Sequence, residues 1–308
     1  WLCLAAVSAA AADVSTLLPG DAPVGKVARD AEGNLYVAVA LMEQRGDITV
    51  HRRLVVFKMD KTGTRSRYRR EIGGSGYEYP AGLAVTPDGR AFVIGSTTDR
   101  NFPTTPGAFQ PQAGPGENNG FLVALNAEGS VQYSTFLSTA AEAIAVNAAG
   151  EAYVANRGLV MKLEASGSRQ VFAFEGVGGS HIALDREGNV FLAGTAQDPS
   201  YPTTPGAYQR DFQPAVCGGG TIGIPCLHVT VTKLNAAGTA LVYSTFIAAS
   251  RNEAAGALAV DDNGYAYVGV NTSAADRRGM RRIIAQSSDT HGAGLAEGCR
   301  GELASTRV

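Results

Sequence analysis

The sequence predicts an all-β protein, and more specifically a β-propeller made of four-stranded antiparallel blades. Three observations lead to this prediction. An apolar run, a turn containing a glycine and a second apolar run form a unit that occurs five times in the 308 residues. A second hairpin follows each of the first four units. The connections between hairpins alternate between a nearly constant and a variable length, which is typical of repeated propeller blades.

The first hairpin of each repeat has arms rich in Val, Ile, Leu, Tyr and Phe, as expected for buried strands. Its turn contains a glycine, which adopts a positive φ without steric cost. The five copies are Val27–Ala40, Leu83–Gly95, Ala143–Ala155, Ile182–Gly194 and Ala257–Val270, with turn glycines Gly33, Gly89, Gly150, Gly188 and Gly264. Asp residues in these turns also suggest calcium, but no copy matches the D-x-[DN]-x-[DN]-G pattern of a calcium loop. We therefore predict plain turns.

The second hairpins are Val55–Tyr68, Phe121–Leu137, Leu159–Phe174 and Val229–Ile247, with turn glycines Gly63, Gly129, Gly167 and Gly238. We letter the four strands of a repeat A to D. The distance from a second-hairpin glycine to the next first-hairpin glycine is 26, 21, 21 and 26 residues, whereas within a repeat it is 30, 40, 17 and 50 residues. The D–A link is therefore short, and the B–C loop accepts insertions. We expect about five blade-like repeats, the last of them incomplete or atypical.

The two ends of the chain differ from the repeats, which span residues 13–275. Residues 1–12 resemble the remnant of a secretory signal peptide, with a buried first strand as the alternative. Val14–Leu18 (VSTLL) is similar to the D strands YSTFL and YSTFI, so we expect it to complete the last blade and remove an exposed edge. Residues 276–308 lose the strand pattern. There, Arg281–Gln286 is either a poor C strand or part of a poorly ordered tail that is foreign to the fold.

Charge and hydropathy exclude two classes of partner. Four arginines, Arg65, Arg67, Arg69 and Arg70, gather on the predicted D strand of the first repeat, but the net charge is −2. A nucleic-acid surface needs a strong basic excess, so we expect a solvated edge that resists pairing with other sheets, and no nucleic-acid partner. The apolar segment 1–12 is too short to cross a bilayer, so no membrane span is predicted.

Two B–C loops carry nearly the same peptide, RNFPTTPGAFQ at Arg100–Gln110 and SYPTTPGAYQR at Ser200–Arg210. The prolines restrict φ, the glycines permit a turn, and the aromatic side chains can anchor the loop on its blade. The peptide is either a structural plug that covers the end of its blade or a ligand-facing pair of aromatic residues, and its repetition favours the plug. The candidate binding residues are Phe102, Thr104, Phe109, Gln110, Tyr201, Thr203, Tyr208 and Gln209.

This peptide also carries a family resemblance. GLAVTPDGRAFVIGSTTDRNFPTTPGAFQ, followed by NNGFLVALNAEGSVQYSTFL, resembles the bacterial β-propeller repeat family often labelled SBBP, and Val190–Ile247 has the same elements in the same order. The resemblance covers roughly Val14 to Ser273. It implies a propeller in a secreted or envelope-associated bacterial protein, and it implies no catalytic residues. Repeats one and three depart from the pattern because they lack the PTTPGA insert.

The cysteines and histidines indicate a disulfide rather than a reaction centre. Cys217 and Cys226 flank a Gly-rich stretch inside the long insertion of repeat four, and a disulfide between them suits an oxidising compartment. Zinc is a weaker alternative, because His228 lies nearby but no second pair of ligands has suitable spacing. The other histidines, His51, His181 and His291, show no pairing, and no G-x-S-x-G, P-loop or H-E-x-x-H motif occurs. We predict no catalytic residues, no metal and no cofactor.

The blade topology suggests where binding takes place. In an antiparallel blade all B–C loops emerge at one end, and loops on a rigid scaffold are common binding sites. We therefore expect a secreted, periplasmic or cell-surface scaffold that binds an extracellular protein or glycan through its B–C loop face, as a monomer or as part of a larger chain. The alternatives are a metal-dependent propeller hydrolase or lyase and a purely structural module of a larger surface protein. The repeated acids disfavour the enzyme, because they lie in the A–B turns at the other end.

Overall fold

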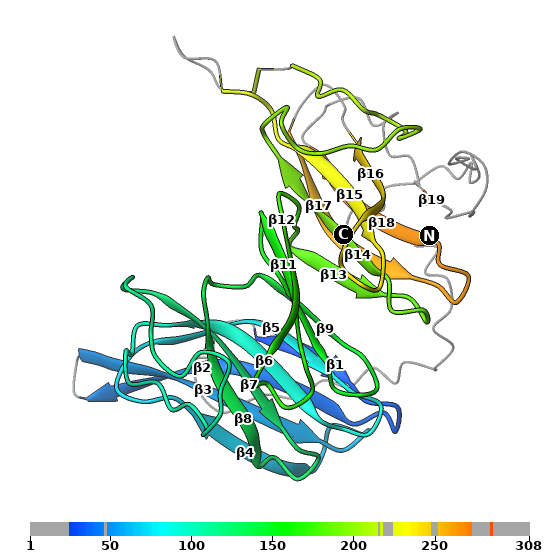
Figure 1. Cartoon of the computed structure of the whole chain (residues 1–308). Helices are drawn as coiled ribbons and strands as arrows, with labels where there is room; N and C mark the ends of the chain where they lie inside the picture. The colour runs from blue at the N-terminus through cyan, green and yellow to red at the C-terminus, as the bar shows by residue number, and fades with distance from the viewer. Residues whose placement is uncertain are drawn as a thin grey trace, which may run out of the picture.

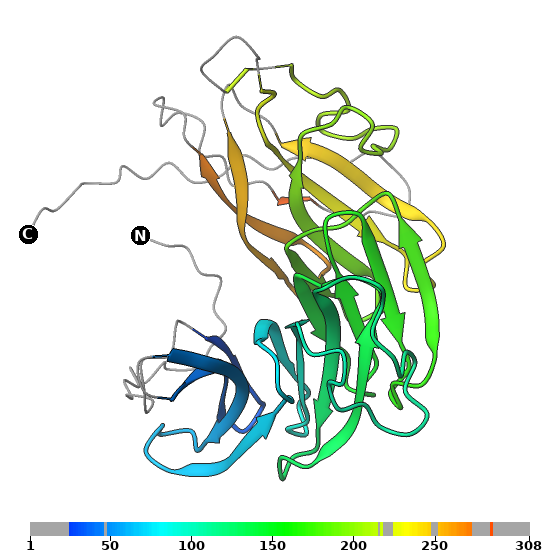
Figure 2. The same ribbon diagram turned by 90° about the vertical axis from the view of Figure 1, so that its left-hand side faces the viewer.

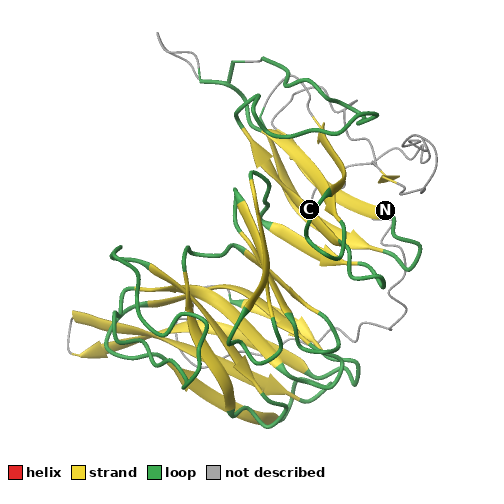
Figure 3. Ribbon diagram, viewed as in Figure 1, coloured by secondary structure: helices red, strands yellow, loops and turns green. Residues whose placement is uncertain are grey.

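The computed structural model describes residues 25–45, 48–214, 216–217, 224–247, 252–272 and 284–285. These residues form strands, turns and loops and no helix (Figure 3). None of them therefore belongs to a helix that could span a membrane. The predicted signal remnant 1–12, the predicted closing strand Val14–Leu18 and nearly all of the tail 276–308 lie outside the described residues.

The strands form five antiparallel sheets in chain order (Figure 1). Sheet one contains β1 (Lys26–Arg29), β2 (Leu35–Arg45), β3 (Ile48–Met59) and β4 (Ser66–Ile72). Sheet two contains β5 (Glu78–Val85), β6 (Ala91–Thr97), β7 (Asn119–Leu125) and β8 (Val131–Leu137). Sheet three contains β9 (Ala143–Val146), β10 (Ala152–Ala155), β11 (Leu159–Leu163) and β12 (Gln170–Glu175). Sheet four contains β13 (His181–Leu184), β14 (Val190–Ala196), β15 (His228–Leu234) and β16 (Leu241–Ile247).

The fifth sheet has three described strands. They are β17 (Glu253–Val260), β18 (Ala266–Thr272) and the short β19 (Ile284–Ala285). β19 lies inside Arg281–Gln286, the segment for which a poor C strand was one of the two alternatives from the sequence. It pairs with Ala266 and Tyr267 of β18. The prediction of an all-β protein made of four-stranded antiparallel sheets is confirmed for the first four repeats.

The predicted turn glycines adopt the predicted conformation. All nine have φ between 66° and 90°. In every turn the glycine N–H donates to the carbonyl oxygen of the residue three positions earlier, for example Gly33 to Asp30 and Gly167 to Glu164. The positive φ therefore serves a closed turn, and the positions of these glycines determine where each hairpin reverses.

Each sheet packs on the next one along the chain. The contacts between neighbouring sheets involve the A strands β1, β5, β9, β13 and β17. Buried side chains fill the first three boundaries, with Tyr36, Leu54 and Phe121 in the first, Phe92, Leu122 and Met161 in the second, and Val160, Val190 and Leu234 in the third. Figure 2 shows the result, an arc of sheets with sheets one and five at its two ends. Both faces of an inner sheet are therefore buried, which explains the non-alternating apolar strands.

One aromatic pair recurs in the first four sheets. A ring on the B strand meets a ring on the D strand edge to face, with centroids 6.3–6.4 Å apart, in Tyr36–Tyr68, Phe92–Tyr133, Tyr153–Phe172 and Phe191–Tyr243. The first three D-strand rings also cover the C–D turn glycine of the next sheet. A Cβ added to Gly129, Gly167 or Gly238 would lie within 3.0 Å of the ring of Tyr68, Tyr133 or Phe172. Glycine is thus required at these positions for two reasons. The turn needs a positive φ, and the ring of the preceding sheet leaves no room for a Cβ.

Candidate functional site: the B–C loops

The repeated PTTPGA peptide lies along the outer edge of the D strand in its own sheet. In sheet two, the N–H of Thr105 donates to Ser134 O at 3.0 Å, and the N–H of Phe136 donates to Gln110 O at 2.9 Å. In sheet four, Thr204 and Ser244 make the first of these bonds and Gln209 and Phe246 the second, each at 3.0 Å. The peptide therefore forms hydrogen bonds with backbone N–H and C=O groups of the D strand that would otherwise be unpaired at the edge of the sheet. We call Arg100–Gln110 and Ser200–Arg210 the edge straps.

A three-residue seat on the D strand holds each edge strap. In sheet two, the seat is Ser134–Thr135–Phe136. The Ser134 hydroxyl donates to Pro103 O at 2.6 Å, and Thr135 Oγ1 accepts from the N–H of Gln110 at 2.8 Å. Ser244–Thr245–Phe246 makes the same bonds in sheet four. The predicted plug over the blade end is therefore wrong in its location, because these hydroxyl and backbone groups hold the peptide at the outer edge.

The two sheets without an insert also lack the seat. At the equivalent positions β4 has Arg69–Arg70–Glu71 and β12 has Ala173–Phe174–Glu175, as the strand registers show. Neither triplet offers the paired hydroxyls. The sequence contained this signal, because Ser-Thr-Phe in the D strand occurs only in the repeats with a PTTPGA insert. It was missed because the seat and the strap are about thirty residues apart in repeat two.

The structure buries one of the four candidate aromatic residues fully and two partly. Phe102 is 2% exposed and stacks on Phe121 with ring centroids 4.8 Å apart. The Tyr201 hydroxyl lies 2.7 Å from Thr232 Oγ1 in the core between sheets three and four. Phe109 packs against the core between sheets two and three. Tyr208, at 47%, is the exposed one of the four. Phe102, Phe109 and Tyr201 therefore anchor the edge straps, and Tyr208 is the most exposed of the four.

The candidate polar residues bond within their own loops. The hydroxyls of Thr104 and Thr203 donate to Pro111 O and Arg210 O at 3.1 and 3.2 Å. The side-chain amides of Gln110 and Gln209 donate to Gln112 O and Asp211 O at 3.1 and 3.2 Å. All four side chains belong to half-buried residues. The two edge straps thus form equivalent side-chain hydrogen bonds within their own loops, as expected for a repeated structural role.

The predicted disulfide is present. Cys217 and Cys226 are bonded, with their Cα atoms 4.9 Å apart, and Val216, just before the closed loop, pairs with Pro225 inside it. Cys226 is buried, whereas Val216 and Ile224 are 68% and 54% exposed. The disulfide therefore closes a narrow segment of the fourth insertion, with one exposed apolar side chain within the closed loop and one directly before it.

Reduction of this disulfide is expected to lower the free energy of unfolding by about 2–3 kcal/mol. The reduced unfolded chain is no longer restricted by the closed loop, and a loop of this length accounts for an effect of that size. The double variant C217S/C226S is expected to show the same loss without a reductant. Thermal unfolding followed by circular dichroism, with and without dithiothreitol, measures both. An unchanged transition in the reduced protein would contradict the stabilising role.

His228 has a buried structural role that its sequence position did not reveal. Its Nδ1 lies 3.1 Å from Glu253 Oε2, and its Nε2 lies 2.8 Å from the carbonyl oxygen of Gln213. Both His228 and Glu253 are buried. Leu227, between the disulfide and His228, accepts the N–H of Glu253 at 2.9 Å. The fourth insertion is therefore tied to the first strand of sheet five.

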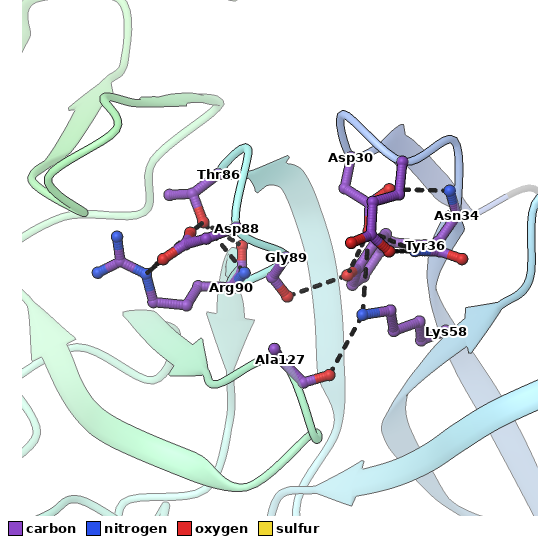
Figure 4. Close-up of polar contacts among 10 residues, drawn as sticks. Asp30, Asn34, Tyr36, Lys58, Thr86, Asp88, Gly89, Arg90 and Ala127 are labelled. Atoms are coloured by element: carbon purple, nitrogen blue, oxygen red, sulfur yellow. Dashed lines mark hydrogen bonds and ion pairs between the residues drawn. The ribbon is translucent and has the colours of Figure 1, made fainter.

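In three sheets an acid of the A–B turn is paired with a lysine from the C strand, Asp30 with Lys58, Glu151 with Lys162 and Asp185 with Lys233. Asp30 accepts two hydrogen bonds from Asn34, and the Lys58 ammonium lies 3.9 Å from its carboxylate (Figure 4). The Tyr36 hydroxyl lies 3.0 Å from Asp30 and 3.0 Å from Gly89 O of the next sheet. Lysine thus supplies the positive charge that a calcium ion would bring. In the described part of the chain, no three His, Cys, Asp or Glu side chains are placed to hold a metal.

The same arrangement in sheet four makes part of the stability sensitive to acid. Burial alone would raise the pKa of Asp185, but hydrogen bonds from Asn189 and Lys233 lower it below the ordinary value of 3.8. The stabilisation is therefore complete above pH 3.8 and is lost as the pH falls through the folded-state pKa. Between about pH 5 and about pH 2, D185N should lose less stability than the wild type. Urea unfolding at a series of pH values measures this, with the exposed D262N as the control; parallel losses in D185N and wild type would contradict it.

A hollow lies between repeats three and four at the B–C end. The B–C connection of sheet three is the short turn around Arg157. The B–C connection of sheet four is the long fourth insertion, which lies next to that turn. The space between them has a volume of about 440 Å³ and is lined by Arg157 and Gly176 on one side and by Gln197, Asp198 and Tyr201 on the other. The difference in loop length between neighbouring repeats therefore creates a concave surface next to the fourth insertion.

Comparison with known proteins gives no family assignment. No family model matches the chain, and no curated protein matches it. Among solved structures, it is similar to the gluconolactonase XC5397 from Xanthomonas campestris, with 13% identity, a TM-score of 0.32 and coverage of 55% of this chain and 52% of that one. It is also similar to PorZ, a bacterial surface component of the type-IX secretion system of Porphyromonas gingivalis, with 12% identity, a TM-score of 0.40 and coverage of 86% and 33%. This chain thus spans about half and one third of those proteins, and the SBBP resemblance stays a prediction.

Proposed function

We propose that this chain belongs to a secreted or cell-surface β-propeller of the SBBP type, which binds an extracellular protein through its B–C loop face. One observation carries the proposal. The fourth insertion presents two exposed apolar side chains, Ile224 within the loop that the disulfide closes and Val216 directly before it. Solvent-exposed apolar side chains on a covalently restricted segment lose little entropy when a partner covers them, which favours binding.

The order of packing supports the propeller. Consecutive sheets contact each other through their A strands, and the D-strand rings repeat the same contact with the next sheet. Small sheets that stack about an axis in this way are protected when the ring closes. We propose that Val14–Leu18 adds to the last sheet in the closed protein.

The surface chemistry favours a protein partner over a glycan. Glycan sites commonly present several aromatic faces to solvent, but Phe102, Phe109 and Tyr201 pack against the cores between sheets, which leaves Tyr208 as the exposed ring of the two straps. The exposed side chains at the disulfide are aliphatic, and aliphatic side chains gain most from contact with another apolar surface. The disulfide also suits the oxidising conditions outside the cytoplasm.

The double variant V216D/I224D tests the proposal. Labelled protein is titrated onto envelope preparations of the source bacterium that are untreated, protease-treated or periodate-oxidised. We expect saturable binding that weakens by at least about tenfold in the variant, disappears after protease treatment and survives periodate. V131D/V242D, which changes two exposed valines on β8 and β16, is the matched control and should bind like the wild type. Undiminished binding of V216D/I224D, or loss of binding after periodate, would contradict a protein-binding insertion.

A further inference from the structure

The four D strands that form the outer edges of sheets one to four are protected in different ways. Edge straps cover β8 and β16. No strap covers β4 among the described residues, but Arg67, Arg69 and Arg70 line it, and charged side chains on an edge resist pairing with other strands. β12 has the sequence Gln-Val-Phe-Ala-Phe-Glu, without lysine or arginine. In the described part of the chain it pairs with β11 alone. Within the described residues it is therefore the D strand with no strap and with a single charged side chain, Glu175, at its end.

The backbone of β12 is oriented to receive another strand. β12 pairs with β11 in the register in which β8 pairs with β7, so that Ala173 and Glu175 correspond to Ser134 and Phe136. Ser134 and Phe136 are the residues whose backbone groups bond to the edge strap. Ala173 and Glu175 are exposed, and within the described residues their backbone groups bond to nothing outside sheet three.

The chain cannot cover this edge from its own third repeat. The edge strap of sheet two comes from a long B–C loop, between Thr97 and Asn119. The B–C connection of sheet three joins Ala155 to Leu159, and three intervening residues span only about 10 Å even when extended. The place that an edge strap occupies in sheets two and four is thus left to a segment from elsewhere.

We propose that the edge of β12 is a strand-addition site for an extended segment of a protein partner. Such a segment pairs with Ala173 and Glu175 as the edge straps pair with their seats, and main-chain bonds of this kind are a recurring mode of peptide recognition. Gly176, which follows β12 directly, lines the hollow between repeats three and four. A segment that passes Glu175 therefore continues into that hollow.

The charges and apolar groups near β12 define the segment. The exposed Val171 and Ala173 favour β-branched or aromatic residues at alternate positions. Glu175 and Asp198 lie at the end that meets the hollow, and Arg157 there is already 3.4 Å from Glu142. A lysine or arginine near that end of the segment is therefore favoured. This site is separate from Val216 and Ile224, so the two proposals fail independently.

Two variants close the site. In the strapped variant, Arg157 is replaced by Asp99–Asn118 of repeat two, and the seat is built with A173S, F174T and E175F. In A173P, the outward N–H is removed, a change that an edge strand tolerates where that N–H faces solvent. V216D/I224D is the control with the β12 edge intact.

The test selects displayed random peptides of about 12 residues on the wild-type chain and counter-selects them on the strapped variant. We expect peptides with the pattern described above that bind the wild type and V216D/I224D equally and bind both closed variants at least about tenfold more weakly. We also expect the Ala173 and Glu175 amides to exchange faster than those of Ser134 and Phe136 in the free protein, and to slow when peptide binds. Failure to obtain peptides that discriminate between the chains, peptides that leave those two amides unchanged, or slow exchange of both amides in the free protein would overturn the proposal.

Discussion

Replacing Gly167 with alanine is expected to lower the free energy of unfolding by about 2–5 kcal/mol, because two costs add. Gly167 has φ of 70°, a conformation that strains any residue with a Cβ. The new Cβ would also lie within 3.0 Å of the Tyr133 ring, which packs in the core between sheets two and three. The ring must move to admit it, so the boundary between the two sheets is disturbed. Urea unfolding followed by circular dichroism measures the change.

Gly107 is the matched control, because it shares the strained backbone but not the crowding. Its φ is 78°, and a Cβ added there meets nothing within 4 Å. G107A is therefore expected to cost only about 1–2 kcal/mol. Equal losses in G167A and G107A would show that the ring of Tyr133 does not rest on the turn of sheet three.

Replacing Phe102 with alanine is expected to cost about 3–5 kcal/mol, the usual range for removing a fully buried phenylalanine. Phe102 contacts Phe121 and Phe136 in the core between sheets one and two, and it anchors the first edge strap. Its loss leaves a cavity and frees the start of the strap. The same unfolding experiment measures it.

Tyr208 provides the comparison on the second edge strap. It is exposed, so Y208A is expected to change the free energy of unfolding by less than about 0.5 kcal/mol. This pair of variants separates the two interpretations of the repeated peptide. If F102A left stability unchanged, the aromatic residues of the straps would not be anchors, and a ligand-facing role would regain support.

Local patterns predicted the hairpins, their turns and the disulfide. The positions of Gly33 and Gly63 in repeat one suffice to place both turns of sheet one, because a closed turn with positive φ needs glycine whatever lies around it. Cys217 and Cys226 are close in sequence, and a loop of that length leaves them few other ways to pair. These features depend on residues that are neighbours in the chain.

Contacts between distant residues were not predicted. Lys58 and Asp30 belong to different hairpins, and the sequence shows only that both are charged. His228 and Glu253 belong to different sheets, so neither residue alone indicates the pair. The location of the edge straps depends on a backbone edge, which has no signature of its own. Only the joint occurrence of Ser-Thr-Phe and PTTPGA in repeats two and four could have revealed it.

Sheets one to four pack on one another in chain order, with a D-strand ring of each of the first three placed on a turn glycine of the next. The most direct measurement is the NMR chemical shift of the Hα protons of Gly129, Gly167 and Gly238, together with nuclear Overhauser contacts to the rings of Tyr68, Tyr133 and Phe172. Packing in chain order predicts strong upfield ring-current shifts and one ring contact for each of these glycines. It predicts neither for Gly188, whose added Cβ meets only Ala236. Random-coil shifts at all three glycines, or contacts to rings of non-adjacent sheets, would contradict the stacked arrangement.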